Sequence, residues 1–371
     1  MKKYLVVFPL MLLFFISNAC KSSKSTQKAE VVTEHPSFEF KPLSKEVQTN
    51  FLNKKLASNA LVDPGYWTWG LSVVQWTDGK YHAYYSRWKY EFGFNAWLTD
   101  CEIAHAVSDT PEGPYIFKNV VLESRNKAGW EFATAHNPNV CVANGKLYLY
   151  YISTDLEGVY DGDREGQSVS KWIASNWSIA RNRQRIGLAT ASNPDDTFTR
   201  ISKPVVVPQE GVFKNIAVNP AVIFSKGKFT MIMKGDDIGH EKDFRIQLAG
   251  HSKSGEGPFE FEKKPVYDQA QTEDATLWYD QKLKQYFMVC HVIGKPNLLL
   301  LSSKDSYQWK SEESSVFTKK EILLDNGEIW KPERMERPFV LTDKKGQPIM
   351  LFVAIKDKGV SGNIAIPIKK K

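Results

Sequence analysis

Four short segments of the chain place ionisable or amide side chains directly before apolar, strand-like runs. They are His136-Asn137, Asn219, Glu273-Asp274 and Glu336-Arg337. Burying a carboxylate costs a large desolvation free energy unless the group is paired or used in chemistry, so these positions are candidates for a functional site. Crowding of like charges raises the pKa of one carboxyl group, which suits a general acid. Glu273, with Asp274 and Glu336 as partners, therefore supplies the groups for acid–base catalysis.

A repeated unit explains why these segments resemble one another. Each copy starts with an apolar strand, passes a turn containing Gly or Lys, and returns through a strand rich in Tyr and Phe. A further strand, a Ser/Asp/Gly turn and an aromatic strand follow, which makes four strands per copy. Five copies predict an all-β fold, a five-bladed β-propeller of four-stranded antiparallel blades. A two-sheet β-sandwich would explain the strands but not their ordered recurrence.

The propeller predicts that the polar segments meet in space. The innermost strand of each blade lines a central channel, so the starts of the five innermost strands converge at one mouth. Expected substrate-binding residues are Trp69, Arg87, His136, Asn137, Asn219 and Arg337. Trp69 suits stacking on a sugar ring, and Arg87 or Arg337 could hold a carboxylate ionised or bind an acidic sugar. The inserts at residues 91–100 and 155–182 are expected to cap one face. The segment 363–368 and the segment near residues 40–60 are expected to close the ring.

The arrangement of residues 60–355 resembles the five-bladed propeller glycosidases of glycoside hydrolase family 43 and its relatives. In that family a blade-one Asp-Pro supplies the general base, a blade-three Asp tunes the pKa, and a blade-four Glu is the general acid. The resemblance implies that Glu273 is the acid, whereas Asn219 stands at the blade-three position. The blade-one position falls at Trp69-Gly70. Asp63, in Asp63-Pro64 just upstream, is therefore the candidate base.

These observations favour a glycoside hydrolase that acts on polysaccharide-derived oligosaccharides, and they leave two alternatives. A non-catalytic surface glycan-binding propeller would have its carboxylates engaged in ion pairs. A related glycoside phosphorylase would use Arg87, Arg337 and His136 to bind phosphate. Structural roles are also open: Asp63 as a turn residue, His136 as a strand cap, and Glu336-Arg337 as an ion pair between blades.

The N-terminus has the features of an export signal. Lys2 and Lys3 precede an apolar run over 4–16 and the sequence Ser17-Asn18-Ala19-Cys20, which resembles a bacterial lipobox. We expect residues 1–20 to be a lipoprotein signal peptide, with Cys20 lipidated and the protein anchored to the bacterial cell envelope. An ordinary secretory signal cut near Ala19 is the alternative. Residues 21–40, rich in Lys, Ser and Thr, predict a flexible tether before a propeller domain at 41–371.

Composition limits the other function classes. The formal charge is +7, but the lysines are dispersed and no nucleic-acid-binding motif is present. Three cysteines besides Cys20, without tight spacing, do not indicate a disulfide framework or a zinc motif. The scattered histidines do not form a metal motif, so no cofactor is expected, and nothing in the spacing demands a Ca²⁺ ion in the channel. An oligosaccharide is the expected partner of a monomeric protein.

Overall fold

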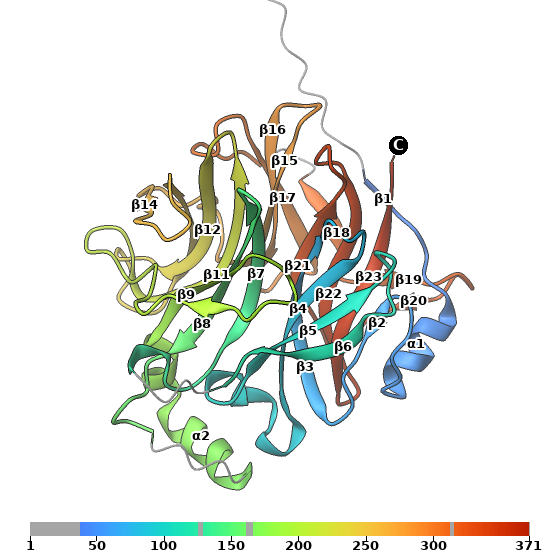
Figure 1. The fold of residues 1–371 in the computed structure, drawn as a ribbon, viewed down its shortest axis with the longest axis horizontal. Helices are drawn as coiled ribbons and strands as arrows, with labels where there is room; N and C mark the ends of the chain where they lie inside the picture. The colour runs from blue at the N-terminus through green and yellow to red at the C-terminus, as the bar shows by residue number, and fades with distance from the viewer. Residues whose placement is uncertain (1–37, 125–128, 161–165, 312–314, 371) are drawn as a thin grey trace, which may run out of the picture. The chain divides into compact units, whose positions relative to one another are not determined.

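The computed structural model describes residues 38–124, 129–160, 166–311 and 315–370. These residues form the predicted five-bladed propeller, in which each blade is a four-stranded antiparallel sheet (Figure 1). The predicted signal peptide, Cys20 and most of the predicted tether lie outside the described residues. Within the described part of the chain, no helix is both long and apolar enough to cross a membrane.

Four of the blades use strands that follow one another in sequence. Their strands, from the channel outward, are β3 (Tyr66–Gln75), β4 (Tyr81–Lys89), β5 (Glu102–Ser108) and β6 (Ile116–Leu122) in blade 1; β7 (His136–Ala143), β8 (Lys146–Thr154), β9 (Gln184–Ala191) and β10 (Thr199–Arg200) in blade 2; β11 (Lys214–Ser225), β12 (Lys228–Asp236), β13 (Arg245–Ser252) and β14 (Glu260–Phe261) in blade 3; and β15 (Thr272–Asp280), β16 (Gln285–Val292), β17 (Asn297–Ser303) and β18 (Val316–Lys319) in blade 4.

The fifth blade closes the ring by joining the two ends of the described chain. Its strands are β21 (Arg334–Thr342), β22 (Pro348–Asp357), β23 (Val360–Lys370) and β1 (Phe38–Phe40). Phe38 pairs with Lys370, and the short β2 (Ala60–Leu61) also pairs with β23. The prediction that 363–368 and the segment near 40–60 close the ring is confirmed. Residues 38–40, which the sequence placed in the tether, belong to the sheet.

A short helix and a small hairpin pack beside the fifth blade. The helix α1 (Lys45–Leu52) begins at Ser44, whose side chain accepts a hydrogen bond from the Glu46 backbone N–H. The hairpin consists of β19 (Ile322–Leu323) and β20 (Ile329–Trp330). Phe51 of α1 is fully buried against the Trp330 ring, with centroids 5.3 Å apart. These apolar contacts cover the outer part of the closing blade.

The tyrosine- and phenylalanine-rich second strands of the blades form the packed core between neighbouring sheets. The largest fully buried side chains include Tyr84, Tyr85, Tyr150, Tyr151 and Phe287. Three further buried residues, Cys101, Cys141 and Cys290, are free thiols, so the described fold is held without disulfides among them. Apolar packing of the blades therefore positions the channel.

Each innermost strand carries one β-bulge at an equivalent place. The register shifts there, and the bulge residue has a positive φ between 36° and 60°. The five bulge residues, one per blade, are Gly70, Asn137, Asn219, Asp274 and Arg337. The left-handed region is unfavourable for most residues with a Cβ, and such conformations cluster at functional sites. The bulges therefore mark the channel mouth as the place to look for chemistry.

Polar side chains below the bulges tie neighbouring blades together. Ser72 accepts a hydrogen bond from the Val140 N–H (2.9 Å), and Asn139 accepts one from the Val222 N–H (2.8 Å). Thr276 Oγ1 likewise accepts from the Val340 N–H of the next blade (3.0 Å). These contacts satisfy buried backbone donors that face a neighbouring blade instead of a partner strand.

Replacing Thr276 with Val should lower the free energy of unfolding by about 1–3 kcal/mol, because the isosteric change leaves the buried Val340 N–H without an acceptor. Urea denaturation followed by tryptophan fluorescence measures the change. Thr276→Ser, which keeps the hydroxyl, should retain most of the lost stability. Equal stability of the Val variant and the wild type would show that this bond between blades contributes nothing.

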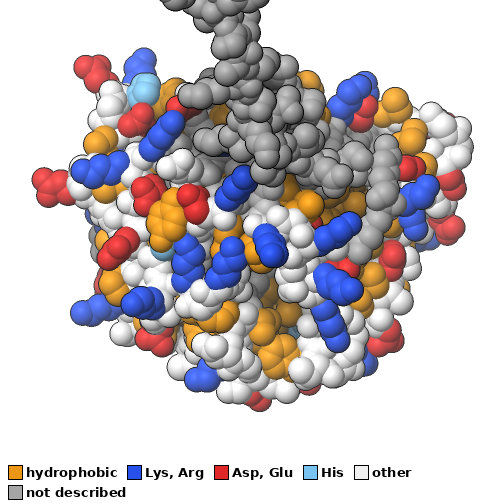
Figure 2. Space-filling view, turned by 90° about the horizontal axis from the view of Figure 1, so that it is seen from above, with side chains coloured by type: hydrophobic (Ala, Val, Ile, Leu, Met, Phe, Trp, Pro, Cys, Tyr) orange, Lys and Arg blue, Asp and Glu red, His pale blue; other side chains and the backbone are white. Residues whose placement is uncertain are grey.

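The two ends of the channel differ in character. The end near the strand termini such as Val142, Phe224 and Leu341 opens into a wide hollow of about 920 Å³. Figure 2 views the protein from above Figure 1, and there the described Lys and Arg side chains are scattered among hydrophobic ones. This distribution agrees with the expectation that the positive charge forms no nucleic-acid-binding stripe. The other mouth, on the side of α2 (Gly166–Asn182), holds the polar strand starts (Figure 1).

Candidate active site

A cavity of about 200 Å³ occupies the mouth at which the bulges lie. Side chains from all five blades line it, together with residues of the two predicted caps, such as Trp97 and Trp177. Of the residues predicted for the site, eight line it: Trp69, His136, Asn137, Asn219, Glu273, Asp274, Glu336 and Arg337. The bulge explains why consecutive residues such as Glu273 and Asp274 share the cavity, since successive side chains of a regular strand point to opposite faces.

The bulge residues form a hydrogen-bonded chain around the channel. Asn137 Nδ2 donates to Asn219 Oδ1 (3.0 Å), and Asn219 Nδ2 donates to Asp274 Oδ1 (2.6 Å). Arg337 approaches the same carboxylate from the fifth blade, through its backbone N–H (3.4 Å to Oδ2) and through Nη1 (3.3 Å to Oδ1). Asp274 thus accepts three donors from blades 3 and 5, which is the environment of an ionised carboxylate.

Blade 1 has no side chain in this chain of bonds, and its glycine has a steric reason. A Cβ at Gly70 would lie 3.0 Å from Arg337 Nε and 3.3 Å from Arg337 Cγ. The position also has a φ of 36°, which glycine adopts at little cost. Gly70 therefore leaves the space that the Arg337 side chain fills.

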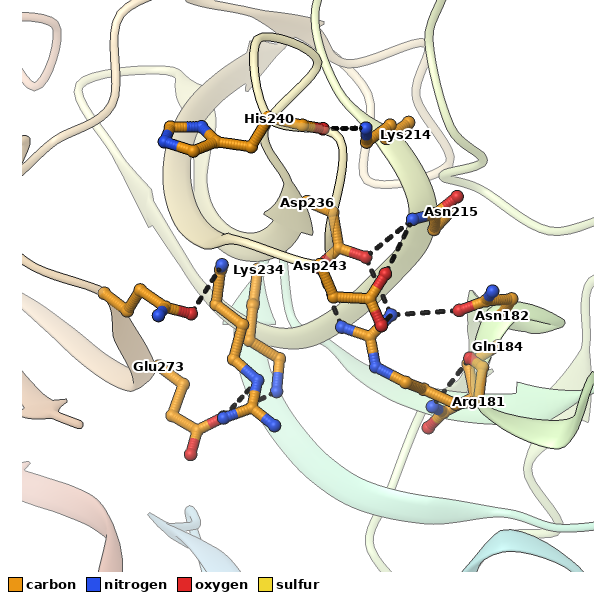
Figure 3. A network of polar contacts seen from close by, with 12 residues as sticks. Arg181, Asn182, Gln184, Lys214, Asn215, Lys234, Asp236, His240, Asp243 and Glu273 are labelled. Atoms are coloured by element: carbon orange, nitrogen blue, oxygen red, sulfur yellow. Dashed lines mark hydrogen bonds and ion pairs between the residues drawn. The ribbon is translucent and has the colours of Figure 1, made fainter. Parts of the chain in front are cut away.

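Glu273 is held by cationic side chains of the neighbouring blade. Lys234 Nζ lies 2.7 Å from Glu273 Oε2, and Arg245 Nε lies 3.9 Å from the same oxygen (Figure 3). Burial alone would raise the pKa of Glu273, but Lys234 and Arg245 lower it well below its usual range. The prediction that crowded carboxylates raise the pKa of Glu273 is therefore wrong, because cations surround it more closely than anions do.

Glu336 pairs with an arginine of its own strand. Arg334 donates to both carboxylate oxygens, at 3.0 and 3.1 Å, and its side chain is 46% exposed. The Arg334 guanidinium also lies 5.7 Å from the centre of the Trp69 ring. The ion pair between blades therefore joins Arg337 to Asp274, whereas Glu336 pairs within the fifth blade at the cavity.

His136 is buried in the cavity wall. Burial, followed by the positive charge of Arg337, lowers the pKa of His136 to about 3, so the ring is neutral at neutral pH. Its Nε2 has no hydrogen-bond partner among the described residues, and the Trp97 ring lies 5.0 Å from it. His136 is therefore more than a strand cap, because it presents an unpaired nitrogen beside the cavity.

Sequence reasoning missed the basic and aromatic residues that complete the wall. Lys234 and Arg245 lie on the second and third strands of blade 3, whose ends the repeat did not single out. Arg181 lies in the last turn of α2 and forms a bidentate pair with the fully buried Asp236, with distances of 2.7 and 2.8 Å (Figure 3). A comparison of all strand ends, beyond the innermost ones, would have found the first two.

Asp63 and Arg87 do not line the cavity; the structure pairs them with each other. Arg87 Nη1 lies 2.6 Å from Asp63 Oδ2, and Tyr85 donates a hydrogen bond to the same oxygen at 3.0 Å. Arg87 also contacts Glu102 at 2.8 Å. The Asp63 carbonyl accepts a hydrogen bond from the Tyr66 N–H in a turn. Asp63 thus takes the structural role of a turn residue, and the loop does not bring it to Glu273.

Two groups of described residues bring histidine and carboxylate atoms within 4.8 Å of one another. One is Glu273, Asp274 and His291, at the cavity. The other is His82, His105 and Asp195, on blades 1 and 2. In the first group both carboxylates already contact cationic side chains, Lys234 and Arg337. In the second, His82 Nδ1 and His105 Nε2 hydrogen bond to each other at 2.9 Å. Protein side chains thus occupy the coordinating atoms of both groups.

Comparisons with known proteins support the fold. No protein-family model matches the chain, and no curated protein matches its sequence. A family 117 glycoside hydrolase of the marine bacterium Zobellia galactanivorans is similar in structure, with a TM-score of 0.60, 16% identity and 90% of each chain covered. A GH43_1 enzyme of Xanthomonas citri has a TM-score of 0.53 at 12% identity, covering 86% of this chain and 93% of that one. The chain therefore has the five-bladed fold of glycoside hydrolases of families 117 and 43.

Proposed function

We propose that the protein is a glycoside hydrolase that cleaves polysaccharide-derived oligosaccharides at this cavity. The observation that carries the proposal is the meeting of Glu273, Asp274 and Glu336 in one cavity with the indole rings of Trp69 and Trp177. Carboxylates supply acid–base chemistry and bind sugar hydroxyls, and aromatic faces pack against sugar rings. The fold shared with glycoside hydrolases supports the same class of reaction.

The electrostatics support different roles for the three carboxylates. Glu273 supplies the ionised partner, because its lowered pKa keeps it charged. Asp274, fixed by Asn219 and Arg337, orients the sugar. Glu336 supplies the proton, since its only hydrogen-bonded cation among the described residues is the half-exposed Arg334, which a substrate can displace. Loss of that cation on substrate entry favours protonation of Glu336.

A non-catalytic glycan-binding propeller is the second candidate. The observation in its favour is that each of the three cavity carboxylates contacts a cationic side chain, namely Lys234, Arg337 and Arg334. The same groups would then bind sugar hydroxyls without breaking a bond. The phosphorylase alternative has less support, because Arg87, one of its three expected phosphate ligands, is bound to Asp63 and Glu102.

The experiment is a screen of the purified protein lacking residues 1–20 against a panel of plant and algal oligosaccharides, with reducing ends measured over time. We expect release from at least one substrate. Glu336→Gln should abolish release, whereas Glu260→Gln, a matched change on the exposed edge strand β14, should preserve it. Release that survives Glu336→Gln would contradict the assignment of the acid.

We further propose that the protein is exported and anchored to the cell envelope through lipid on Cys20. The support is the sequence alone: a basic start, an apolar run and small residues before the cysteine. Metabolic labelling with a palmitate analogue should label the wild type and not Cys20→Ala. Equal labelling of both proteins would exclude Cys20 as the lipidation site.

A further inference from the structure

The cavity wall carries more cationic groups than its own carboxylates need. Five cationic side chains line it: Arg181, Lys234, Arg245, Arg334 and Arg337. Arg181 is neutralised by the fully buried Asp236, which is not part of the lining. Three others each contact one of the three lining carboxylates. Arg245 is the cation in excess.

Arg245 is available for a ligand. Its guanidinium approaches Glu273 only to 3.9 Å, beyond hydrogen-bond distance, and Lys234 already binds that oxygen at 2.7 Å. The Arg245 side chain is 38% exposed and donates no hydrogen bond to another described residue. An arginine that lines a cavity with its planar donors unused is suited to bidentate binding of a carboxylate or sulfate.

A second, independent observation comes from the opposite side of the channel. Arg337 is 8% exposed, yet its Nε has no hydrogen-bond partner among the described residues. Its Nη1 binds Asp274, and the side chain lies against the Gly70 backbone. A buried donor without an acceptor is costly, so an acceptor supplied by a ligand would remove a penalty that the free protein bears.

We propose that the cavity binds an anionic sugar unit, a uronate or a sulfated sugar, with Arg245 and Arg337 donating hydrogen bonds to its anionic oxygens. The proposal rests on the proposed function, because it names the class of substrate for the same cavity. It accounts for why the wall combines tryptophan faces and carboxylates with an unused guanidinium. A neutral sugar would leave Arg245 desolvated without a counter-charge, which disfavours its binding.

Binding of free monosaccharides tests the proposal without requiring catalysis, since they contain no glycosidic bond to cleave. Calorimetric titrations would compare uronic acids and sulfated sugars with the corresponding neutral hexoses. We expect the best anionic sugar to bind at least about tenfold more tightly than its neutral counterpart, as a charge-assisted hydrogen bond implies. The uronate and sulfate titrations separate the two anionic groups.

Arg245→Gln should remove most of this preference, by about tenfold, and should leave binding of neutral sugars nearly unchanged. Lys253→Gln is the matched control, because it removes one positive charge just beyond the opposite end of β13. The preference should survive in the control and weaken with added salt in the wild type. Circular dichroism of both variants checks that they are folded.

The outcomes separate this inference from the proposed function. No measurable binding of any anionic sugar, equal binding of the neutral counterparts, or an unchanged preference in Arg245→Gln overturns the inference. Cleavage of neutral oligosaccharides with no anionic preference would leave the hydrolase proposal standing while overturning this one. Selective binding of anionic sugars without cleavage of their oligosaccharides would do the reverse.

Discussion

Replacing Glu273 with Gln should reduce kcat on a cleaved oligosaccharide by about 10²–10⁴-fold, the usual range for loss of a positioned acid–base group. The substitution keeps the size of the side chain and a hydrogen-bond acceptor for Lys234, but it removes the negative charge that faces the reacting sugar. Initial rates at saturating substrate measure the effect. A variant with kcat within a few-fold of the wild type would remove Glu273 from the chemistry.

The roles assigned to Glu273 and Glu336 predict different responses to the leaving group. Loss of the acid matters less when the leaving group departs without a proton, so Glu336→Gln should retain more activity on an aryl glycoside than on the natural linkage. Glu273→Gln should lose activity on both substrates. The opposite pattern would exchange the two roles and restore Glu273 as the acid.

The pH profile tests the cause of the lowered Glu273 pKa. Burial raises that pKa and Lys234, with Arg245, lowers it, so removing the lysine leaves burial less opposed. Lys234→Met should therefore move the acidic limb of kcat/KM to higher pH, because Glu273 then protonates earlier as the pH falls. Lys234→Arg, which keeps the charge, should leave the limb near its original position. An unmoved limb in the Met variant would show that another group controls it.

The largest expected effect on stability comes from the pair that fixes α2. Replacing Arg181 with Met should lower the free energy of unfolding by about 3–5 kcal/mol, because it leaves the buried Asp236 carboxylate without its bidentate partner. Asn215 Nδ2 still donates to Asp236 at 3.0 Å, but an amide does not neutralise the charge. Urea denaturation measures the loss.

Two further variants make the Arg181 result specific. The double variant Arg181→Met with Asp236→Leu should recover much of the stability, since an apolar pair has no charge to desolvate. Lys356→Gln breaks a more exposed pair with Glu333 and should change the free energy of unfolding by less than about 1 kcal/mol. If Arg181→Met cost no more than Lys356→Gln, the buried pair would not be what holds α2.

The sequence predicted the five blades because apolar strands, turns and aromatic strands recur in a fixed order. The same recurrence located Glu273, Asp274, Glu336 and Arg337 at one mouth. It could not predict which charges meet there, because a bulge shifts the register of each innermost strand. Contacts such as Lys234 with Glu273 join separate blades and depend on that register.

Asp63 shows the limit of arguing from position along the chain. It lies three residues before β3, which placed it close to the expected blade-one base in sequence. A turn and the ion pair with Arg87 hold its side chain away from the cavity. Only the three-dimensional pairing of β3 with β4, which sets Arg87 opposite Thr68, reveals this partner.

The most direct test of the central claim follows one oligosaccharide that binds to the cavity by proton NMR. The wild-type protein should convert the bound ligand to shorter products with a new anomeric signal, and Glu273→Gln should bind the same ligand but leave it intact. The contradicting result is a ligand that binds the wild type with an affinity lowered by substitution in the cavity, yet shows no cleavage after prolonged incubation. The protein would then be a glycan-binding propeller that has the fold of a glycoside hydrolase without its reaction.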